Sequence, residues 1–312
     1  MPPCLMNKMG SMSNQSLLEL LSELNCIIDT KEPMSRYVTF KTGGKAPFVV
    51  TPRDETALCQ IVKIFNDRAI DYLTIGNGSN LLVADAGLSQ PILRLAEPLD
   101  KIELLSQTKI RAYAGAKLSA LCNFACRSCL SGLEFAFGIP GNVGGAVYMN
   151  AGAYGGELSN SIVSVRAVNT DGEIFTLEAS ELELSYRDSI FHRRAWIILS
   201  ADFQLKEGQQ AVIKAAMEDY LARRRDKQPL EYPSAGSTFK RPVGHFAGAL
   251  IEQAGLKGYS IGGAMVSKKH AGFVINYNNA STEDIRQLMR HIQDTVFEKF
   301  GVMLEPEVIY LE

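Results

Sequence analysis

The chain has 312 residues, with 32 lysines and arginines against 34 aspartates and glutamates, and 46% of it is hydrophobic. This length suits about two domains, and the composition is ordinary for a globular protein. A net charge of −2 argues against a nucleic-acid-binding protein, which usually carries a basic excess. No apolar run reaches the roughly 20 residues of a membrane span, and no secretory signal peptide is visible, so we expect a cytoplasmic location and no membrane partner.

The first part of the chain predicts a tail followed by helices and strands. Residues 1–15 carry scattered methionines without a period and predict a flexible N-terminal tail. Ser16 and Glu19 form a capping box that predicts the start of a short helix. The alternation over 37–50 predicts two strands joined by a Gly-Gly turn. Helical period over 55–68 predicts the next helix.

Two glycine-rich loops stand out in the first half of the chain. "GNGSN" (76–80) lies between two predicted strands, and "GIPGNVGG" (138–145) follows another apolar run. Neither matches GxGxxG at the start of a helix in a βαβ unit, so a Rossmann fold is not supported. Backbone N–H groups exposed in such loops can form a nest for a pyrophosphate. The alternative is that each loop is only a tight turn.

Three cysteines recur at a spacing that invites two interpretations. Cys122, Cys126 and Cys129 in "CNFACRSC" have the CxxxCxxC spacing that resembles the cluster-binding motif of radical S-adenosylmethionine enzymes. The same residues lie with Leu118 and Leu121 on one face of an amphipathic helix, where cysteine behaves as a small apolar residue. No glycine or proline interrupts the segment to form the loop that a cluster needs. The helix is therefore the favoured interpretation.

The second half predicts strands and then a change of character. A turn at Asp171 and Gly172 joins two predicted strands, and a further strand is expected over 195–205. A long helix ends near Pro229, and its start near residue 207 marks the predicted domain boundary. The remaining predicted elements are a helix at 247–255, a strand at 273–277, a helix after a Ser281 cap to residue 300, and a final strand.

Three short polar segments carry candidate functional side chains. They are "SYRDSIF" with Tyr186 and Arg187, "SAGSTFKRP" with Ser237 and Lys240, and "LEPEV" with Glu305 and Glu307. Arginine is suited to grip a carboxylate, although a lone arginine is usually a surface residue. Two glutamates two positions apart share a face if the segment is a strand. By default, the serine is a turn residue and the glutamates are solvated.

Seven ordered motifs between about Ser35 and Val308 make the chain resemble one family. They are "TFKTGG", "TIGNGSNLLVAD", "GLEFAFGIPGNVGGAVYMNAGAYGGE", "YRDSIF", "YPSAGSTFKRP", "ALIEQAGLKGYSIGGAMVSKKHAGFVIN" and "LEPEV". Together they resemble the UDP-N-acetylenolpyruvoylglucosamine reductase (MurB) family of peptidoglycan synthesis. The absence of a tyrosine-bearing insertion in the second domain indicates the shorter branch. Arg241 stands where family members often have asparagine.

The resemblance implies an α+β fold in two parts. A FAD-binding domain of the vanillyl-alcohol-oxidase (PCMH) type, with two lobes, would span 16–206, and a smaller α/β substrate-binding domain would span 207–312. The C-terminal strand would return near the first domain. The cysteines would lie on a FAD-domain helix, no metal is implied, and a monomer is favoured. The implied FAD-binding residues are Gly76, Asn77, Gly78, Ser79, Asn80, Gly138, Ile139, Pro140, Gly141, Gly144 and Gly145.

The resemblance also implies a reaction in two halves. NADPH, the co-substrate, would reduce the bound FAD, and the reduced flavin would pass hydride to the enolpyruvyl ether of UDP-N-acetylglucosamine, giving UDP-N-acetylmuramate. Arg187 would grip the substrate carboxylate and favour the developing enolate, Ser237 would donate the proton, and Glu307 would orient or stabilise the intermediate. The implied substrate-binding residues are Tyr186, Arg224, Lys227 and Lys240.

Three other functions remain open from the residues alone. An oxidase of the same FAD fold would lack the "YRDS", "AGSTFK" and "PEV" segments. A radical enzyme would contain iron at the cysteines. A nucleotide-sugar-binding protein with a decayed site would lack one or more of the three implied catalytic residues, and all three are present.

Overall fold

The computed structural model describes residues 14–30 and 32–312. Within them the first helix, α1, spans Asn14–Ser22. Ser16 therefore lies inside the helix, and the predicted capping box at Ser16 and Glu19 is wrong. The predicted tail over 1–15 is wrong for its last two residues, which are helical, and its other residues lie outside the described part of the chain.

The N-terminal lobe is a four-stranded sheet in the order β1-β2-β5-β3, covered by α2 (Glu55–Asp67). Its strands are β1 (Cys26–Thr30), β2 (Phe48–Pro52), β5 (Ile92–Arg94) and β3 (Leu73–Ile75). The Asp54 side chain accepts a hydrogen bond from the Ala57 N–H at 2.7 Å and caps α2. The helix buries Leu58 and Phe65, as its helical period predicts.

A second, larger lobe contains a five-stranded antiparallel sheet in the order β12-β11-β13-β7-β6. Its strands are β12 (Ile174–Glu178), β11 (Ile162–Val168), β13 (Ile197–Gln204), β7 (Lys109–Tyr113) and β6 (Ile102–Leu104). Short pairs complete it: β8 (Leu130–Ser131) with β14 (Lys206–Glu207), and β9 (Gly152–Ala153) with β10 (Gly156–Glu157). The predicted strands in this region, including the pair joined at Asp171 and Gly172, are confirmed.

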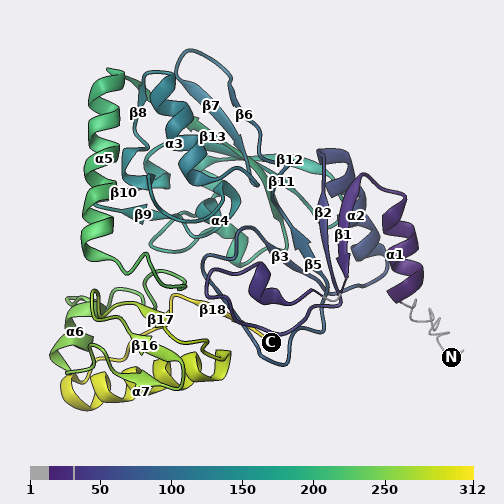
Figure 1. Ribbon diagram of the computed structural model, residues 1–312. Coiled ribbons are helices and arrows are strands. Elements are labelled where there is room, and N and C mark those ends of the chain that lie inside the picture. The colour runs from purple at the N-terminus through teal and green to yellow at the C-terminus, as the bar shows by residue number, and fades with distance from the viewer. Residues whose placement is uncertain (1–13, 31) are drawn as a thin grey trace, which may run out of the picture.

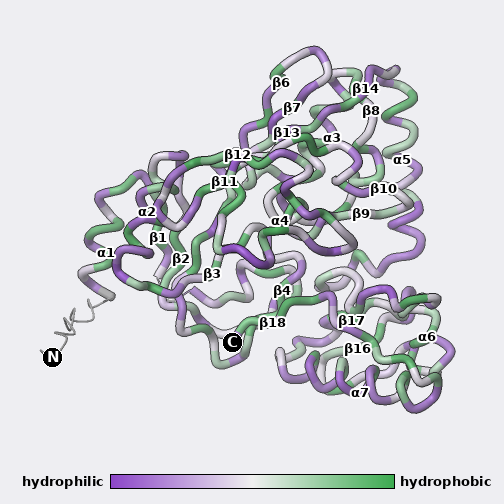
Figure 2. Tube along the Cα trace, turned by 180° about the vertical axis from the view of Figure 1, so that it is seen from behind, coloured by the Kyte–Doolittle hydropathy of each residue, from purple (hydrophilic) through white to green (hydrophobic). Residues whose placement is uncertain are grey.

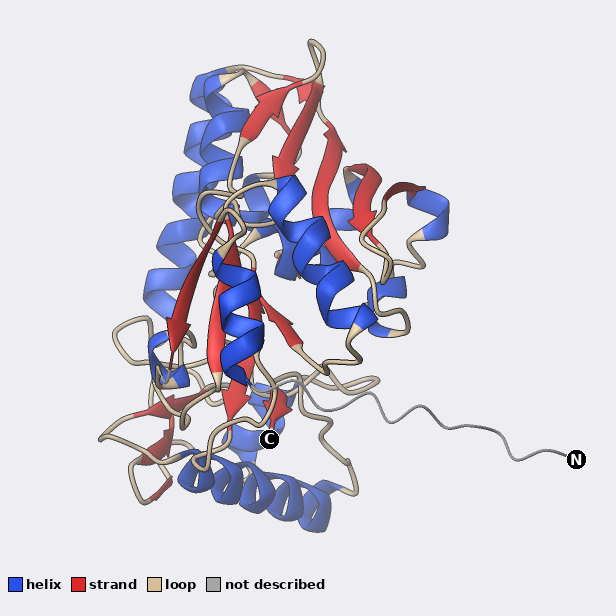
Figure 3. Cartoon of the chain, turned by 90° about the vertical axis from the view of Figure 1, so that its right-hand side faces the viewer, coloured by secondary structure: helices blue, strands red, loops and turns tan. Residues whose placement is uncertain are grey.

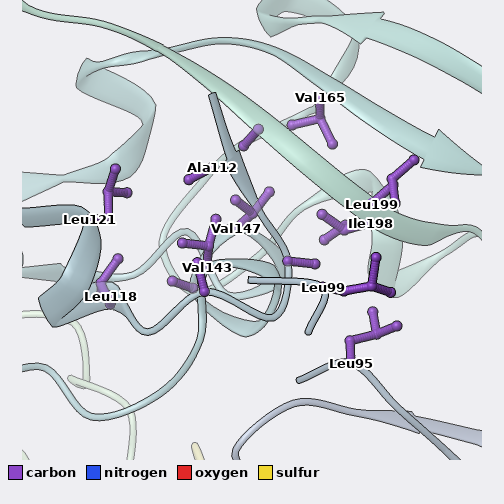
Figure 4. Close-up of a cluster of buried hydrophobic side chains, with 14 of the residues drawn as sticks. Leu95, Leu99, Ala112, Leu118, Leu121, Val143, Val147, Val165, Ile198 and Leu199 are labelled. Atoms are coloured by element: carbon purple, nitrogen blue, oxygen red, sulfur yellow. The ribbon is translucent and has the colours of Figure 1, made fainter. Parts of the chain in front are cut away.

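Three helices pack on this larger lobe: α3 (Leu118–Arg127), α4 (Val143–Tyr148) and α5 (Gln210–Lys227). Figure 4 shows Val143 and Val147 of α4 among side chains from α3 and the five-stranded sheet. The short helix α4 is thus fixed at the centre of the core.

Short 3₁₀ turns occur at η1 (Met34–Arg36), η2 (Glu134–Ala136), η3 (Leu158–Asn160), η4 (Ala179–Glu181) and η5 (Ile190–His192).

The C-terminal lobe combines α6 (Ala247–Gln253), α7 (Thr282–Phe300) and a three-stranded sheet. Its strands are β15 (Ser260–Ile261), β16 (Ala264–Val266) and β17 (Val274–Asn276). Ser281 caps α7 in a reciprocal capping box with Asp284, which confirms the predicted helix start. Figure 2 shows hydrophilic and hydrophobic residues alternating around α7, whose buried face includes Leu288 and Ile292.

The end of the chain returns to the larger part of the molecule. β18 (Ile309–Leu311) pairs in parallel with β4 (Leu81–Val83). Figures 1 and 3 show the C-terminus at the junction between the C-terminal lobe and the rest of the molecule. Although β3 and β4 flank the 76–80 loop as the sequence predicts, they join different partners and not each other.

Helix α5 packs on the larger lobe. Its Ile213 and Met217 belong to the same core as α3 and the five-stranded sheet, and Figure 1 shows the helix along the outer side of that lobe. The predicted boundary near residue 207 instead assigned α5 to the second domain.

The segment 37–50 differs from its prediction. Only its last residues form a strand, β2, and the predicted first strand is an irregular loop. The loop's backbone bonds go elsewhere: Thr39 N–H donates to the Gly78 carbonyl, and Gly44 N–H donates to the Ala84 carbonyl. The alternation in sequence is the same as that of a hairpin, but residues distant in sequence provide the hydrogen-bond partners of this backbone.

No helix in the described ranges is long and apolar enough to cross a membrane.

Candidate active site

The 76–80 loop presents a run of backbone N–H donors. The N–H groups of Asn77, Gly78, Ser79 and Asn80 donate to no other residue in the described part of the chain. Gly78 has φ +60°, and a Cβ there would lie 2.2 Å from the Tyr37 carbonyl oxygen, so protein packing alone requires this glycine. Consecutive unpaired N–H groups fit an anion such as a pyrophosphate.

The 138–145 loop lies beside the first one. The Ser79 hydroxyl donates to the Pro140 carbonyl at 3.1 Å. A Cβ at Gly144 would lie 2.9 Å from the Ala114 Cβ, whereas one at the exposed Gly145 would meet nothing within 4 Å. Gly144 is therefore explained by packing, but the openness at Gly145 leaves room for a bound group to approach the backbone.

Arg224 is a buried cation with unused donors. The residue is 5% exposed, and neither Nε nor Nη2 has a hydrogen-bond partner in the described part of the chain. Its Cζ lies 5.1 Å from the centre of the Tyr154 ring, and a Cβ at Gly138 would lie 3.1 Å from its Cδ. Burial lowers the pKa of this guanidinium. Unpaired buried donors are costly, so a bound acceptor beside the 138–145 loop fits them.

Arg187 occupies a strained turn. Its φ is +58°, which is uncommon for a residue other than glycine, and Ser185 and Asp188 close the turn by mutual backbone hydrogen bonds. The Arg187 Nε donates to Glu307 Oε1 at 2.8 Å, and Nη2 donates to the Gly152 carbonyl at 3.0 Å. The structure thus pairs two residues that the sequence placed 120 positions apart.

Glu307 is mostly buried beside Arg187. The two side chains are 15% and 19% exposed, respectively. Burial raises the pKa of the Glu307 carboxyl, although Arg187 and Lys240 act in the opposite direction. The Asn80 side-chain amide donates to the Glu307 carbonyl at 3.0 Å, so the 76–80 loop holds this residue directly.

Ser237 is brought to the same region by a short backbone pairing. Phe239 and Pro306 form an antiparallel bridge, and Glu307 N–H donates to the Thr238 carbonyl. Ser237 is exposed, and no hydrogen bond of its side chain is present among the described residues. Its hydroxyl is thus available to a ligand.

The two C-terminal glutamates have different environments. Glu305 is 69% exposed and pairs with Lys240, whereas Glu307 is buried against Arg187. Both residues precede β18, so the condition under which they would share a strand face is not met. The sequence alone does not distinguish the two carboxylates, because their different burial arises only from packing.

The other predicted substrate-binding residues are dispersed. Tyr186 is 50% exposed, and its hydroxyl accepts a hydrogen bond from the Arg241 N–H at 3.2 Å. Lys227 is exposed at the end of α5 and has no ion pair within the described residues. Of the predicted set, Tyr186 and Lys240 lie with the Arg187 and Glu307 pair, while Arg224 lies with the 138–145 loop.

The cysteine segment is a helix up to Arg127, which confirms the favoured interpretation for Cys122 and Cys126, but that interpretation is wrong for Cys129, which lies beyond the end of α3 with φ +57° and is exposed. Cys122 and Cys126 are buried in α3, and the Cys122 thiol donates to the Leu133 carbonyl at 3.3 Å. Burial raises the pKa of Cys122 to about 12, so it is not a thiolate at neutral pH. Among the described residues, no three histidine, cysteine or acidic side chains form a metal site.

Sequence reasoning missed two residues that hold the site together. Asn150 and Tyr154 both have positive φ, at +40° and +54°. Asn150 is fully buried and bonds to the Arg187 turn, and Tyr154 covers Arg224. Both lie in "MNAGAY" (149–154), which is separated from the second glycine-rich loop by three residues, and that proximity was the only signal in the sequence.

Comparison with known proteins identifies both parts of the chain. The family model "FAD binding domain" matches residues 46–178, and "UDP-N-acetylenolpyruvoylglucosamine reductase, C-terminal domain" matches 228–311. The reductase of that name from Clostridioides difficile (strain 630) is 46% identical over 301 residues, covering 95% of this chain and 98% of the relative. That from Lachnoclostridium phytofermentans is 45% identical over 297 residues, covering 93% and 96%.

A solved structure agrees with these matches. The crystal structure of UDP-N-acetylenolpyruvylglucosamine reductase (MurB) from Thermus caldophilus superposes with a TM-score of 0.80 at 33% identity, covering 92% of this chain and all of that one. The predicted fold class, a FAD-binding domain of the vanillyl-alcohol-oxidase (PCMH) type with a smaller second domain, is confirmed.

Proposed function

The chain belongs to the UDP-N-acetylenolpyruvoylglucosamine reductase family, and from this premise we propose a two-step reduction with NADPH as the reductant and Ser237 as the proton donor. The product of the proposed reaction is UDP-N-acetylmuramate, a precursor of peptidoglycan. The observation that carries the proposal is the buried pair of Arg187 and Glu307, which lies beside the exposed Ser237 and is bonded to the 76–80 loop.

The two glycine-rich loops are the proposed cradle for FAD. The unused N–H groups of 77–80 would receive its pyrophosphate, and the open face at Gly145 would admit a flat ring. When bound, FAD would accept a hydride from NADPH and deliver it to the methylene carbon of the enolpyruvyl group. We assign Arg224 to this cofactor site instead of the substrate diphosphate, because its unpaired donors lie against Gly138.

Arg187 is the proposed clamp for the substrate carboxylate. Its Nε and Nη2 are engaged by Glu307 and Gly152, which orients the guanidinium and leaves Nη1 for a ligand. A fixed cation favours the negative charge that develops on the carboxylate side of the substrate. Glu307 would act mainly by holding Arg187 in place and by sharing in the charge balance of the intermediate.

Ser237 is the proposed proton donor. An ordinary hydroxyl is a weak acid, so it can protonate only a strongly basic carbon, such as an enolate carbon beside a carboxylate. Lys240 forms an ion pair with Glu305, and its charge acts to lower the pKa of the Glu307 carboxyl, so a second cation lies near this region.

We propose that the substrate-binding domain begins near residue 228, since α5 packs on the larger lobe.

The test is the visible spectrum of the purified chain under anaerobic conditions. We expect a two-band flavin spectrum that bleaches with NADPH and recovers when the enolpyruvyl ether of UDP-N-acetylglucosamine is added. Bleaching without recovery would contradict the substrate, and a flavin unresponsive to NADPH would contradict the reductant. NADH in place of NADPH is the matched control for the reductant.

A further inference from the structure

The end of α4 is bonded to the turn that carries Arg187. The Asn150 side chain donates from Nδ2 to the Ser185 carbonyl at 3.0 Å and accepts from the Ser159 N–H at 3.0 Å. Asn150 is fully buried, so water cannot replace either bond. One amide therefore joins the segment after the 138–145 loop, the η3 turn and the Arg187 turn.

A second connection lies at the last residue of α4. The Tyr148 carbonyl, at the last residue of α4, accepts a hydrogen bond from the Ser189 hydroxyl at 2.7 Å, and His192 Nε2 lies 3.1 Å from the same oxygen. Ser189 is fully buried. Residues on both sides of Arg187 are thus attached to the last residue of α4 or to Asn150 two positions beyond it, and Val143 and Val147 of α4 are fixed in the core.

The Arg187 turn needs such external support. It is a short turn closed by only the two mutual bonds of Ser185 and Asp188, with a positive φ at its arginine. Conformations of this kind persist only where surrounding contacts determine them. The bonds from Asn150 and to Tyr148 are contacts of that type, and they come from the element that directly follows a proposed cofactor loop.

We propose that Asn150 is a positioning residue that sets the orientation of Arg187 and thereby the grip on the substrate carboxylate. The inference rests on the proposed function of Arg187 as that clamp. Asn150 itself touches no reacting atom. Its side-chain amide can form both bonds, since the NH2 group donates and the carbonyl oxygen accepts, and asparagine tolerates the left-handed backbone better than most residues.

The test compares Asn150→Asp with a matched control, Asn276→Asp. Asn276 is also buried, donates from Nδ2 to the Phe40 carbonyl at 3.0 Å and accepts from the Ala280 N–H at 2.8 Å, but it makes no bond to the Arg187 turn. Both changes replace a buried donor by an oxygen that faces a carbonyl, so both should lower stability to a similar degree. Only the first change should disturb Arg187.

The readout is affinity for two ligands that differ in the carboxylate. Asn150→Asp should weaken binding of UDP-N-acetylmuramate at least tenfold, about 1.4 kcal/mol, and leave the affinity for UDP-N-acetylglucosamine, which lacks the lactyl carboxylate, unchanged. It should also raise KM for the enolpyruvyl substrate while flavin reduction by NADPH keeps its rate. Asn276→Asp should change none of these. Equal behaviour of the two variants, or equal loss for both ligands, would overturn the inference.

A milder variant keeps the test decisive if Asn150→Asp does not fold. Ser189→Ala removes the bond to the Tyr148 carbonyl without burying a charge, and it should show the same selective loss for the carboxylate-bearing ligand, at about threefold or more. No selectivity in Ser189→Ala would then count against the inference. Failure of the proposed function is distinguishable, because the wild-type chain would then show no preference for UDP-N-acetylmuramate over UDP-N-acetylglucosamine.

Discussion

Two neighbouring glycines allow a direct test of where the cofactor approaches the backbone. Gly144 and Gly145 both lie in the first turn of α4, and the sequence gives no reason to distinguish them. We consider Gly144→Ala and Gly145→Ala. Neither glycine has a positive φ, so an alanine is not excluded by backbone conformation at either position.

The expected effects on stability differ in sign. Alanine in a helix is favoured over glycine by about 0.5–1 kcal/mol. At Gly144 the new Cβ would lie 2.9 Å from the Ala114 Cβ and 3.3 Å from the Ala114 carbonyl oxygen, so the core must shift. Such overpacking costs about 1–3 kcal/mol, and we expect a net loss of about 1–2 kcal/mol. At Gly145 no atom lies within 4 Å, and the apoprotein should gain up to about 1 kcal/mol.

The assay measures two quantities for each variant. Urea unfolding of the flavin-free chain gives the free energy of unfolding, and titration with FAD gives its affinity. Gly145→Ala should bind FAD at least tenfold more weakly, a loss of about 1.4 kcal/mol, despite an equally stable or more stable fold. Wild-type affinity in Gly145→Ala would refute the view that the open face of this glycine admits the cofactor.

Further predictions concern the proposed catalytic residues and the cysteines. Ser237→Ala should leave flavin reduction by NADPH intact and slow reoxidation by the enolpyruvyl substrate by about 10²–10⁴-fold in stopped-flow measurements; equal slowing of both halves would contradict a proton donor. Burial raises the pKa of Glu307 above its ordinary 4.5, so the folded chain binds this proton more tightly than the unfolded chain. Its stabilising contribution is therefore present below pH 4.5 and is lost as pH rises through the raised pKa. Glu307→Gln should remove that decline, which is measured as the difference between the free energies of unfolding in urea at pH 4 and at pH 7. An unchanged difference would contradict the burial argument. Cys126→Ser should cost about 1–3 kcal/mol of stability and leave the flavin spectrum unchanged, whereas a lost chromophore would argue for a cysteine-bound group.

The helices and strands with strong local signals could be predicted from the sequence. Ser281 with its capping box and the apolar period of α7 identify that helix within its own residues. The segment 37–50 could not be predicted, because its alternation is the same whether a neighbouring strand or the distant Gly78 and Ala84 carbonyls satisfy its backbone. Local patterns fail where the partner of each backbone group lies elsewhere in the chain.

The candidate residues could be named from the sequence only through resemblance, and their environments could not. Glu305 and Glu307 are equivalent in the pattern, yet one is solvated and the other is buried against Arg187. Arg224 belongs to a run of three arginines, and only the structure shows which of them is buried with two guanidinium nitrogens that have no hydrogen-bond partner among the described residues. Burial is a property of the assembled lobes, so no spacing rule could have separated these side chains.

The two members of the ionic pair are each held by an asparagine at or after the end of a glycine-rich loop. Asn80 closes the 76–80 loop and donates to the Glu307 carbonyl, and its own carbonyl accepts from Ile309 at the start of β18. Asn150 follows the second loop and holds the turn of Arg187. A displacement of one loop relative to the other would therefore act on the geometry of the Arg187 and Glu307 pair through these two asparagines. Under the proposed function, the geometry of the Arg187 clamp would thus depend on the two proposed cofactor loops, although no loop residue is required to touch the substrate.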